Sequence, residues 1–352
     1  MLIARAPLRI SLAGGGTDLE AYYGKYGGAV VSTSIDKYFY VFISLSDSEH
    51  IQVSSSDYQT FYRQPIDEAP LWDGDLRLPK AIINRFGIHT GLSVFLASQV
   101  PPGTGLGSSS TVAVALIKAM SVLCGRRLTR GQIAELACEI EIDQLKMPIG
   151  RQDQYAAAFG GLNFFEFRSD GVAVQPFDLP ANVQTDLERR LMLFFTGRSR
   201  NSAEILTEQK RNSERNRAGV IEALHVIHES AVKLRLDLQR GEIGAVGECL
   251  HRSWMAKRQL AHGISDPWID QWYEAARSAG ASGGKIAGAG GGGFLLLYCE
   301  PAQQDRVTAA LKATGLTRMD FRFESGGAMV IVNTLAAQSE AAGIGVHMPS
   351  HA

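Results

Sequence analysis

The sequence has little cysteine, no long apolar segment and no run of like charge. Its four cysteines lie far apart and form no C-x-x-C pair, so we expect reduced thiols rather than a disulfide framework or a cysteine metal site. No apolar run reaches the roughly 18 residues of a membrane span, and no signal-like apolar region follows the N-terminus. A formal net charge of −1 without basic clusters gives no reason to expect nucleic acid or an anionic membrane as a partner. We expect a cytoplasmic protein whose ligand has to be argued from its sites; the sequence does not indicate an oligomeric state.

A chain of 352 residues with 45% hydrophobic residues is long enough for two domains. Hydrophobic patterning in the first half predicts strands at 3–12, 29–35, 38–45, 51–53, 92–97 and 162–167, and helices at 78–86, from 112, 129–145 and from 150. Residues 54–75 show little periodicity, and residues 176–190 are the expected seam between domains. The second half predicts strands at 191–196, 293–299, 319–323 and 328–333, and helices at 202–240, 242–261, 266–279 and 302–313. That order is compatible with a ferredoxin-like second domain, and residues 336–352 are expected to form a flexible tail.

The strongest local signal is the glycine- and serine-rich segment from Pro101 to Thr111, which lies between a predicted strand and a predicted helix. Glycines at alternate positions let the backbone approach a ligand closely and adopt positive φ. The serines that follow stand where a helix start exposes unpaired N–H groups and its positive dipole end, so the pattern indicates a phosphate chain. The spacing fits neither a Walker A loop nor a dinucleotide loop. The alternative is an ordinary tight turn with a serine N-cap.

The segment P-P-G-T-G-L-G-S-S-S-T resembles the ATP-phosphate loop of the GHMP kinase superfamily, P-x-G-x-G-L-G-S-S. This resemblance implies ATP as phosphate donor. It implies ATP contacts from Pro101, Gly103, Thr104, Gly105, Leu106, Gly107, Ser108, Ser109, Ser110 and Thr111. It further implies a two-domain α+β fold, with a ribosomal-S5-like α/β domain over residues 1–178 and a ferredoxin-like α+β domain over residues 179–335.

A second segment ends the first predicted strand in Gly14-Gly15-Gly16-Thr17-Asp18, nine residues beyond Arg9. Taken alone, it could be a glycine turn with the aspartate as a helix N-cap. Sugar kinases of the superfamily carry a similar R-x-x-L-x-G followed by T-D, in which the arginine lies beside the catalytic aspartate and the second aspartate holds sugar hydroxyls. The resemblance implies substrate contacts from Gly15, Gly16, Thr17 and Asp18.

The same segment bears on the choice of sugar. Galactokinases have G-E-H-x-D where this chain has G-G-G-T-D, so galactose is not the expected substrate. The A-G-G-G-T-D version resembles bacterial D-glycero-D-manno-heptose 7-phosphate kinases, which act in making activated heptose for surface polysaccharide. This resemblance implies phosphorylation of the anomeric hydroxyl to give the 1,7-bisphosphate. Alternatives are another anomeric kinase such as L-fucokinase, a catalytically silent sugar sensor, and a decarboxylase of the phosphorylated-mevalonate kind.

A third pattern pairs Glu141 with Asp153, twelve residues further on. Such a pair could simply be a surface glutamate and an N-capping aspartate. However, Gly150-Arg151-Gln152-Asp153-Gln154 resembles the G-x-x-D-Q of the sugar kinases, where the aspartate is the base. On this resemblance Asp153 would orient and deprotonate the sugar hydroxyl and Arg9 would stabilise its carboxylate. Ser109 and Glu141 would hold Mg²⁺ between the β- and γ-phosphates.

A fourth segment, Lys285 to Phe294, contains a literal G-x-G-x-x-G. We reject a dinucleotide site because the segment follows helix-like residues and leads into an apolar strand, whereas a dinucleotide loop follows a strand and opens a helix. The segment is similar to the superfamily motif K-x-x-G-A-G-x-G-G. This resemblance implies that Gly288, Gly290 and Gly291 approach the substrate from the second domain, so that the active site lies between the domains.

The last cluster, Thr196-Gly197-Arg198-Ser199-Arg200-Asn201-Ser202, follows a predicted strand and opens a helix. Its arginines, Arg198 above all, could bind the distal phosphate of a sugar 7-phosphate bidentately. The alternative is exposed cations with a serine capping the helix. Arg151 and Lys37 are further candidates for the same phosphate.

Overall fold

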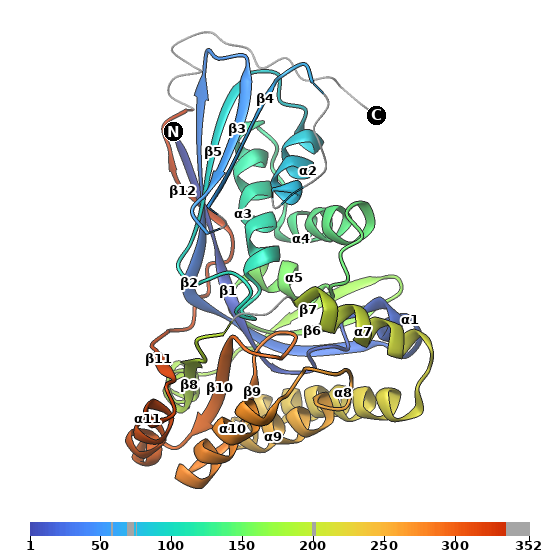
Figure 1. Cartoon of the computed structure of the whole chain (residues 1–352), viewed down its shortest axis with the longest axis vertical. Helices are drawn as coiled ribbons and strands as arrows, with labels where there is room; N and C mark the ends of the chain where they lie inside the picture. Colours follow the sequence, from blue (N-terminus) through green and yellow to red (C-terminus); the bar gives the residue numbers. More distant parts are fainter. Residues whose placement is uncertain (58, 69–73, 75, 199–201, 336–352) are drawn as a thin grey trace.

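The structure, a computed structural model, describes residues 1–57, 59–68, 74, 76–198 and 202–335. Figure 1 shows a large sheet with helices in the upper part of the molecule and a smaller sheet lying on long helices in the lower part. The predicted two-domain α+β architecture is therefore confirmed. The predicted tail, 336–352, and Ser199, Arg200 and Asn201 lie outside the described residues. Among the described residues, no helix is long and apolar enough to cross a membrane.

Long, mainly antiparallel strands build the larger sheet. Its strands are β1 (Leu2–Ala13), β2 (Gly28–Ser46), β3 (His50–Ser55), β4 (Thr60–Pro65), β5 (Gly91–Ser98), β6 (Leu162–Arg168), β7 (Gly171–Pro176) and β12 (Met329–Asn333). The order is β12-β1-β2-β5-β3-β4, with β6 and β7 joined to the other end of β2. Because β2 spans 19 residues, its first part pairs with β6 and its last part with β5. The two strands predicted at 29–35 and 38–45 are thus one.

Helices cover the larger sheet and bury its apolar face. They are α2 (Arg77–Phe86), α3 (Ser108–Leu123), α4 (Arg130–Cys138) and α5 (Gln152–Phe159), with a π-helical turn at Glu139–Gln144 and α1 (Glu20–Tyr26) nearer the second domain. The start of α4 is a capping box, as its sequence suggests: the Thr129 side chain accepts a hydrogen bond from the Gln132 backbone N–H at 3.2 Å. Fully buried Val114, Ile117 and Phe165 are part of the core between α3 and the sheet.

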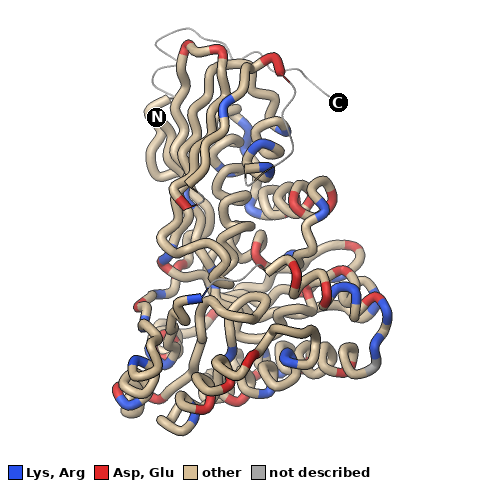
Figure 2. Tube along the Cα trace, in the orientation of Figure 1, with Lys and Arg blue, Asp and Glu red and all other residues tan. Residues whose placement is uncertain are grey.

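The smaller sheet has a ferredoxin-like strand order, which agrees with the kind of second domain that the sequence predicts. Its strands are β8 (Leu191–Phe195), β9 (Ala281–Ile286), β10 (Phe294–Cys299) and β11 (Thr317–Met319), in the antiparallel order β11-β8-β10-β9. The remaining helices are α6 (Ala181–Arg190), α7 (Ser202–Glu214), α8 (Ala218–Gln239), α9 (Ala245–Lys257), α10 (Pro267–Ala279) and α11 (Gln304–Ala313). Figure 2 shows cationic and anionic residues interspersed along these helices.

A shared apolar cluster joins the two domains. It contains Leu8 and Ile10 of β1, Leu296 of β10 and Leu234 of α8, all buried at 0–1% exposure. The backbone also crosses between the domains, because β12, which follows the second domain in the chain, pairs with β1. The predicted range 179–335 for the second domain therefore includes a strand of the first sheet, so that boundary needs correcting at its C-terminal end.

Several elements escape the sequence patterns. Strand β4 lies inside the stretch predicted as irregular, because an edge strand with exposed Phe61 does not show a clean alternation. The predicted domain boundary at 176–190 contains structure. Strand β7 ends in it at Pro176, and helix α6 begins after Pro180 and occupies the rest of it. The helix predicted over 202–240 is broken into α7 and α8, where Asn216 adopts φ 47°.

Strand β9 was missed because its centre is glycine rather than apolar. A Cβ atom on Gly283 would lie 1.8 Å from the Gly247 carbonyl oxygen of α9, so only glycine lets this helix pack so closely on the strand. Strand β11 is also displaced, lying at 317–319 instead of the predicted 319–323.

The shared cluster makes a prediction about stability. Leu296→Ala should lower the free energy of unfolding by about 2–5 kcal/mol, because the side chain is fully buried between the domains. Leu236→Ala on α8, at 47% exposure, is the matched control and should change it by less than about 0.5 kcal/mol. Urea unfolding followed by circular dichroism measures the free energy of unfolding of both variants. Equal losses in the two variants would contradict a stabilising role for this cluster between the domains.

Candidate active site

A cleft between the domains brings together the glycine loops and the predicted catalytic pair. The predicted residues that line it are Arg9, Gly16, Asp18, Gly103, Gly105, Gly107, Ser108, Ser109, Ser110, Asp153 and Gly288. In Figure 1 the start of α3 lies at the middle of the molecule, where the two domains meet. Segments separated by up to 279 residues, from Arg9 to Gly288, thus meet in one site.

Buried Arg9 and partly exposed Asp153 form a two-pronged ion pair, with side-chain exposures of 5% and 23%. The guanidinium Nε and Nη2 atoms donate to the two carboxylate oxygens at 2.7 and 2.9 Å. The third guanidinium nitrogen, Nη1, donates to the Gly105 carbonyl oxygen at 2.6 Å. A fork of this kind fixes the plane of the carboxylate and compensates its charge, so Asp153 is held ready beside the phosphate loop.

The phosphate loop has the backbone that its sequence predicts. Gly103, Gly105 and Gly107 have φ of 72°, 83° and 83°, and α3 begins directly afterwards at Ser108. A Cβ atom on Gly107 would lie 3.2 Å from the Asp153 carboxylate, so the loop approaches the catalytic pair closely. The N–H groups at the start of α3 and its dipole consequently face the cleft, which suits a phosphate chain.

Other residues predicted to bind ATP support the loop instead of lining the cleft. The Thr104 hydroxyl donates to the Pro101 carbonyl at 2.9 Å, and the Thr111 hydroxyl donates to the Gly107 carbonyl at 2.9 Å. Leu106 is fully buried in the cluster between the domains. The prediction of direct ATP contacts is therefore corrected for these side chains, because internal hydrogen bonds and burial occupy them.

The second glycine loop touches the first, backbone to backbone. A Cβ on Gly288 would lie 2.5 Å from the Gly105 Cα, so the two loops meet without side chains between them. This loop follows strand β9, so the prediction that it follows helix-like residues is wrong. It leads into β10 and not into a helix, so a dinucleotide-binding loop remains excluded. Gly290 and Gly291 pack on Ile264, whose carbonyl accepts a hydrogen bond from the Gly291 N–H at 2.9 Å. Neither glycine is among the described residues that line the cleft.

Asp18, in the first glycine segment, is a buried carboxyl group that lines the cleft. It is 3% exposed and accepts hydrogen bonds from the Gly16 N–H at 2.9 Å and from the Gln152 backbone and side-chain nitrogens at 3.2 Å. Burial raises the pKa of Asp18, and its backbone hydrogen bonds oppose that effect. Gly150 must be glycine here, since a Cβ would lie 2.0 Å from an Asp18 carboxylate oxygen.

Thr17 and Gly15 belong to the fold of this loop rather than to its exposed face. The Thr17 hydroxyl is fully buried, donates to the Gly14 and Ala29 carbonyls at 2.8 and 3.0 Å and accepts from the Ala29 N–H at 3.1 Å. Gly15 is buried against Ser11 and Gln152. The Thr17 hydroxyl is thus engaged within the protein, and the predicted substrate contact of Thr17 stays a prediction.

The two residues predicted to hold Mg²⁺, Ser109 and Glu141, differ in their surroundings. Glu141 is fully buried and accepts from the Ser110 hydroxyl at 3.1 Å and from the Gln154 amide at 2.7 Å, whereas Ser109 is exposed at the cleft. Successive residues of a helix point about 100° apart, so only one of these neighbours can face the glutamate. Burial raises the pKa of Glu141 to about 8.

The cations predicted to bind a distal phosphate are engaged elsewhere. Arg198 pairs with Asp266 at 3.6 Å and lies over the Trp268 and Trp272 rings, with its guanidinium 5.4 and 5.5 Å from their centroids. Arg151 pairs with Glu135, and Lys37 pairs with Asp36 at 3.4 Å. None of the three is among the described residues that line the cleft.

Sequence patterns missed a polar wall of the cleft that belongs to the second domain. Ser202, Leu206 and Gln209 line it from α7, and Lys257 lines it from the end of α9. The spacing i, i+4, i+7 places the α7 residues on one helical face, but mixed polar residues all around this helix hide that signal. Lys257 is 7% exposed and its Nζ donates to the Gly288 carbonyl. Burial and neighbouring Arg9 lower the pKa of Lys257 to about 8, while Asp18 and Asp153 oppose this shift.

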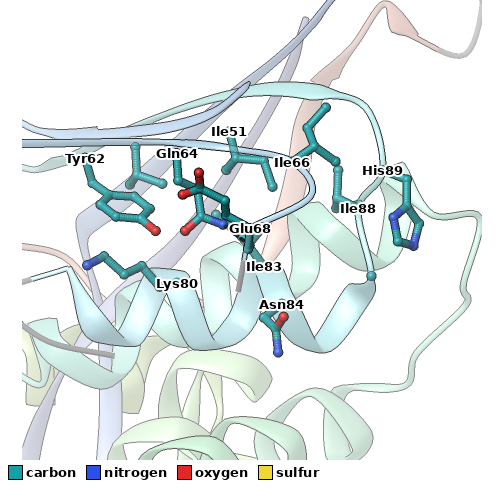
Figure 3. Close-up of a pocket in the computed structure, with 12 residues that line it drawn as sticks. Ile51, Tyr62, Gln64, Ile66, Glu68, Lys80, Ile83, Asn84, Ile88 and His89 are labelled. Atoms are coloured by element: carbon teal, nitrogen blue, oxygen red, sulfur yellow. Dashed lines mark hydrogen bonds between the residues drawn. The ribbon is translucent and has the colours of Figure 1, made fainter. Parts of the chain in front are cut away.

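A second cavity lies apart from the cleft, between the β3–β4 hairpin and α2. Figure 3 shows Ile51, Ile66, Ile83 and Ile88 around it, with Lys80 reaching toward the Tyr62 ring. The Lys80 ammonium lies 3.9 Å from that ring's centroid. This cavity contains none of the predicted site residues.

Comparisons with known proteins agree with this geometry. The family description "GHMP kinases N terminal domain" matches residues 77–161, and "GHMP kinases C terminal" matches residues 234–316. A Campylobacter jejuni protein named D-glycero-alpha-D-manno-heptose 7-phosphate kinase is 34% identical over 92% of this chain and 96% of its own length. A solved structure described as a D-glycero-D-manno-heptose 1-phosphate kinase from Bacteroides thetaiotaomicron is 30% identical, covers 95% of this chain and 99% of its own, and superposes with a TM-score of 0.78. A mevalonate kinase from Pyrococcus abyssi is 28% identical over 93% of this chain and 97% of its own length.

The buried glutamate makes a prediction about pH. The folded state holds a proton on Glu141 up to about pH 8, whereas an unfolded glutamic acid releases it near pH 4.3. Stability should therefore fall as pH rises between these values, since the folded state binds more protons. Glu141→Gln should remove this decline, measured by urea unfolding between pH 5 and 8 without divalent cations.

Glu139→Gln is the matched control, since Glu139 is 53% exposed on the same turn and pairs with Arg85. It should leave the pH dependence of unfolding as in the unaltered protein. An unchanged pH dependence in Glu141→Gln would contradict the buried, protonated state of Glu141.

Proposed function

The chain belongs to the GHMP kinase family and is a sugar kinase, and from this premise we propose that its substrate is D-glycero-D-manno-heptose 7-phosphate. The product would be the 1,7-bisphosphate, formed by transfer of the γ-phosphoryl group of ATP to the anomeric hydroxyl. The observation that carries the proposal is the Arg9–Asp153 pair between the phosphate loop and the buried Asp18. The 34% identity over nearly the full length to a heptose 7-phosphate kinase supports the choice of sugar.

Asp153 would act on the sugar hydroxyl. Phosphoryl transfer needs the hydroxyl in line with the γ-phosphate and a group that accepts or orients its proton. Asp153 lies within the cleft beside Gly107 and is fixed through both carboxylate oxygens, so one of them would accept the hydroxyl proton as the O–P bond forms. Arg9 would balance charge as the phosphoryl group passes.

The phosphate loop would hold ATP through its backbone. N–H groups of the loop and of the first turn of α3 would bind phosphate oxygens, and the Ser108 and Ser109 hydroxyls would add donors. Mg²⁺, when bound, would neutralise charge on the phosphates. We propose that Ser109, which lies at the cleft, and Glu141, which accepts a hydrogen bond from Ser110 at 3.1 Å, would hold this hard cation through their oxygen atoms.

The substrate side would recognise sugar hydroxyls. Asp18 can accept hydrogen bonds from two hydroxyls, and the Gln152 amide oxygen is buried without a hydrogen-bond partner among the described residues. Such unsatisfied acceptors favour a polyol ligand over an apolar one. We place the reaction in the cytoplasm, where ATP is available, as a step toward activated heptose for capsule, lipopolysaccharide or S-layer glycans.

A substrate panel tests the proposed function. ADP release with ATP and Mg²⁺ is measured for heptose 7-phosphate, mannose 6-phosphate, mannose, L-fucose, galactose and mevalonate. The expected result is the highest kcat/KM with heptose 7-phosphate. Faster turnover of free fucose, or no turnover of any compound on the panel, would contradict the proposed substrate.

The catalytic role of Asp153 makes a separate prediction. Asp153→Asn should lower kcat by about 10²–10⁴-fold, because the amide cannot accept the proton. Affinity for ATP, measured by calorimetry, should stay nearly unchanged because this carboxylate is not a phosphate ligand. Asp320→Asn, whose side chain is 94% exposed, is the matched control. Ordinary turnover by Asp153→Asn would remove Asp153 from the reaction.

A further inference from the structure

The proposed substrate carries a phosphate that the residues assigned so far leave without a partner. Arg9 is committed to Asp153 and to Gly105, and Arg198, Arg151 and Lys37 pair with carboxylates outside the cleft. A dianionic group taken out of water needs cationic or N–H donors in contact with it. The second-domain wall of the cleft is where such donors remain.

Gln209 presents an unused donor there. Its side chain is 1% exposed, it lines the cleft, and its Nε2 atom has no hydrogen-bond partner among the described residues. The amide lies against the sugar-side loop, since a Cβ on Gly16 would come 2.8 Å from Nε2. A buried amide N–H without an acceptor costs free energy, and a ligand oxygen in the cleft would supply the acceptor.

Lys257 presents a cation to the same cleft from the end of α9. Its ammonium donates one hydrogen bond to the Gly288 carbonyl, which leaves two N–H donors. Lys257 is only 7% exposed, and this burial lowers its pKa to about 8. A phosphate oxygen in contact would favour the charged form and offset the cost of burial.

We infer that Lys257 and Gln209 form the subsite for the distal phosphate of the sugar, which sets the preference for a phosphorylated over an unphosphorylated substrate. The inference rests on the proposed function. It assigns selectivity to α7 and α9 of the second domain, whereas the reacting hydroxyl is held by Asp153 of the first. The Lys257 ammonium and the Nε2 group of Gln209 are hydrogen-bond donors. They match the oxygens of a phosphate dianion, which only accept hydrogen bonds.

Calorimetric affinities test this subsite without depending on turnover. Dissociation constants are measured for D-glycero-D-manno-heptose 7-phosphate and for the same heptose without its phosphate, with Lys257→Met, Gln209→Met and Lys210→Met. Methionine keeps the length of each side chain and removes its donors. Lys210 is the matched control because it follows Gln209 on α7 but is exposed.

Lys257→Met should weaken binding of the phosphorylated heptose by about 10- to 100-fold, and Gln209→Met by about 3- to 10-fold. Affinity for the unphosphorylated heptose should stay within about twofold for both variants, because only the phosphate contacts are lost. Lys210→Met should change neither constant. Thermal melting of each free variant checks that the fold is retained.

Several results would overturn the subsite. Equal losses of affinity for the two sugars in Lys257→Met would give Lys257 a general or structural role. Loss of the preference for the phosphorylated sugar in Arg198→Ala but not in Lys257→Met would also overturn the subsite. Equal affinities of the unaltered protein for both sugars would show that no distal-phosphate site exists. Failure of the proposed function is distinguishable, since it would appear as no binding or turnover of heptose 7-phosphate by the unaltered protein.

Discussion

The Arg9 guanidinium is the group on which the geometry of the cleft depends. It holds both oxygens of Asp153 at the start of α5 and the Gly105 carbonyl of the phosphate loop, and its own backbone N–H donates to Leu106. One side chain therefore fixes the Asp153 carboxylate relative to the glycine loop before α3. Since Gln152, one residue before Asp153, binds Asp18, the position of Asp18 is linked to the same arginine. Removing either partner of a buried pair leaves an uncompensated charge, so the arrangement is costly to change.

Glycine carries the second constraint, the close approach of the two domains. Gly105 and Gly288 touch without side chains, and Gly293 packs on the Thr104 backbone, where a Cβ would lie 2.2 Å from the carbonyl oxygen. Around these contacts the apolar cluster of β1, β10 and α8 keeps the domains together. Donors of the phosphate loop and donors of the second domain thereby face one space, as a reaction between a nucleotide and a sugar phosphate requires.

Much of this site could be predicted from the sequence, because the chemistry of the motifs is local. Alternate glycines before an apolar helix specify an anion loop, and the arginine and aspartate motifs were correctly placed together. What the sequence patterns do not show depends on tertiary contacts. The hydrogen bond from Ser110 to Glu141 and the packing of Arg198 on Asp266 and two tryptophans join residues distant in the chain. Lys257 and Gln209 lie in helices whose patterns give no sign of the cleft. Strand β9 could not be recognised in the sequence, because α9 packs so closely on it that its centre is glycine instead of apolar side chains.

The position of the transferred phosphate is the most direct test of the account. The purified protein is incubated with ATP, Mg²⁺ and D-glycero-D-manno-heptose 7-phosphate, and the product is examined by ¹H and ³¹P NMR. The account predicts one ADP per sugar and a product with two phosphorus resonances, one of them coupled to the anomeric proton. Phosphate on any other hydroxyl, or use of heptose 1-phosphate instead of the 7-phosphate, would contradict it.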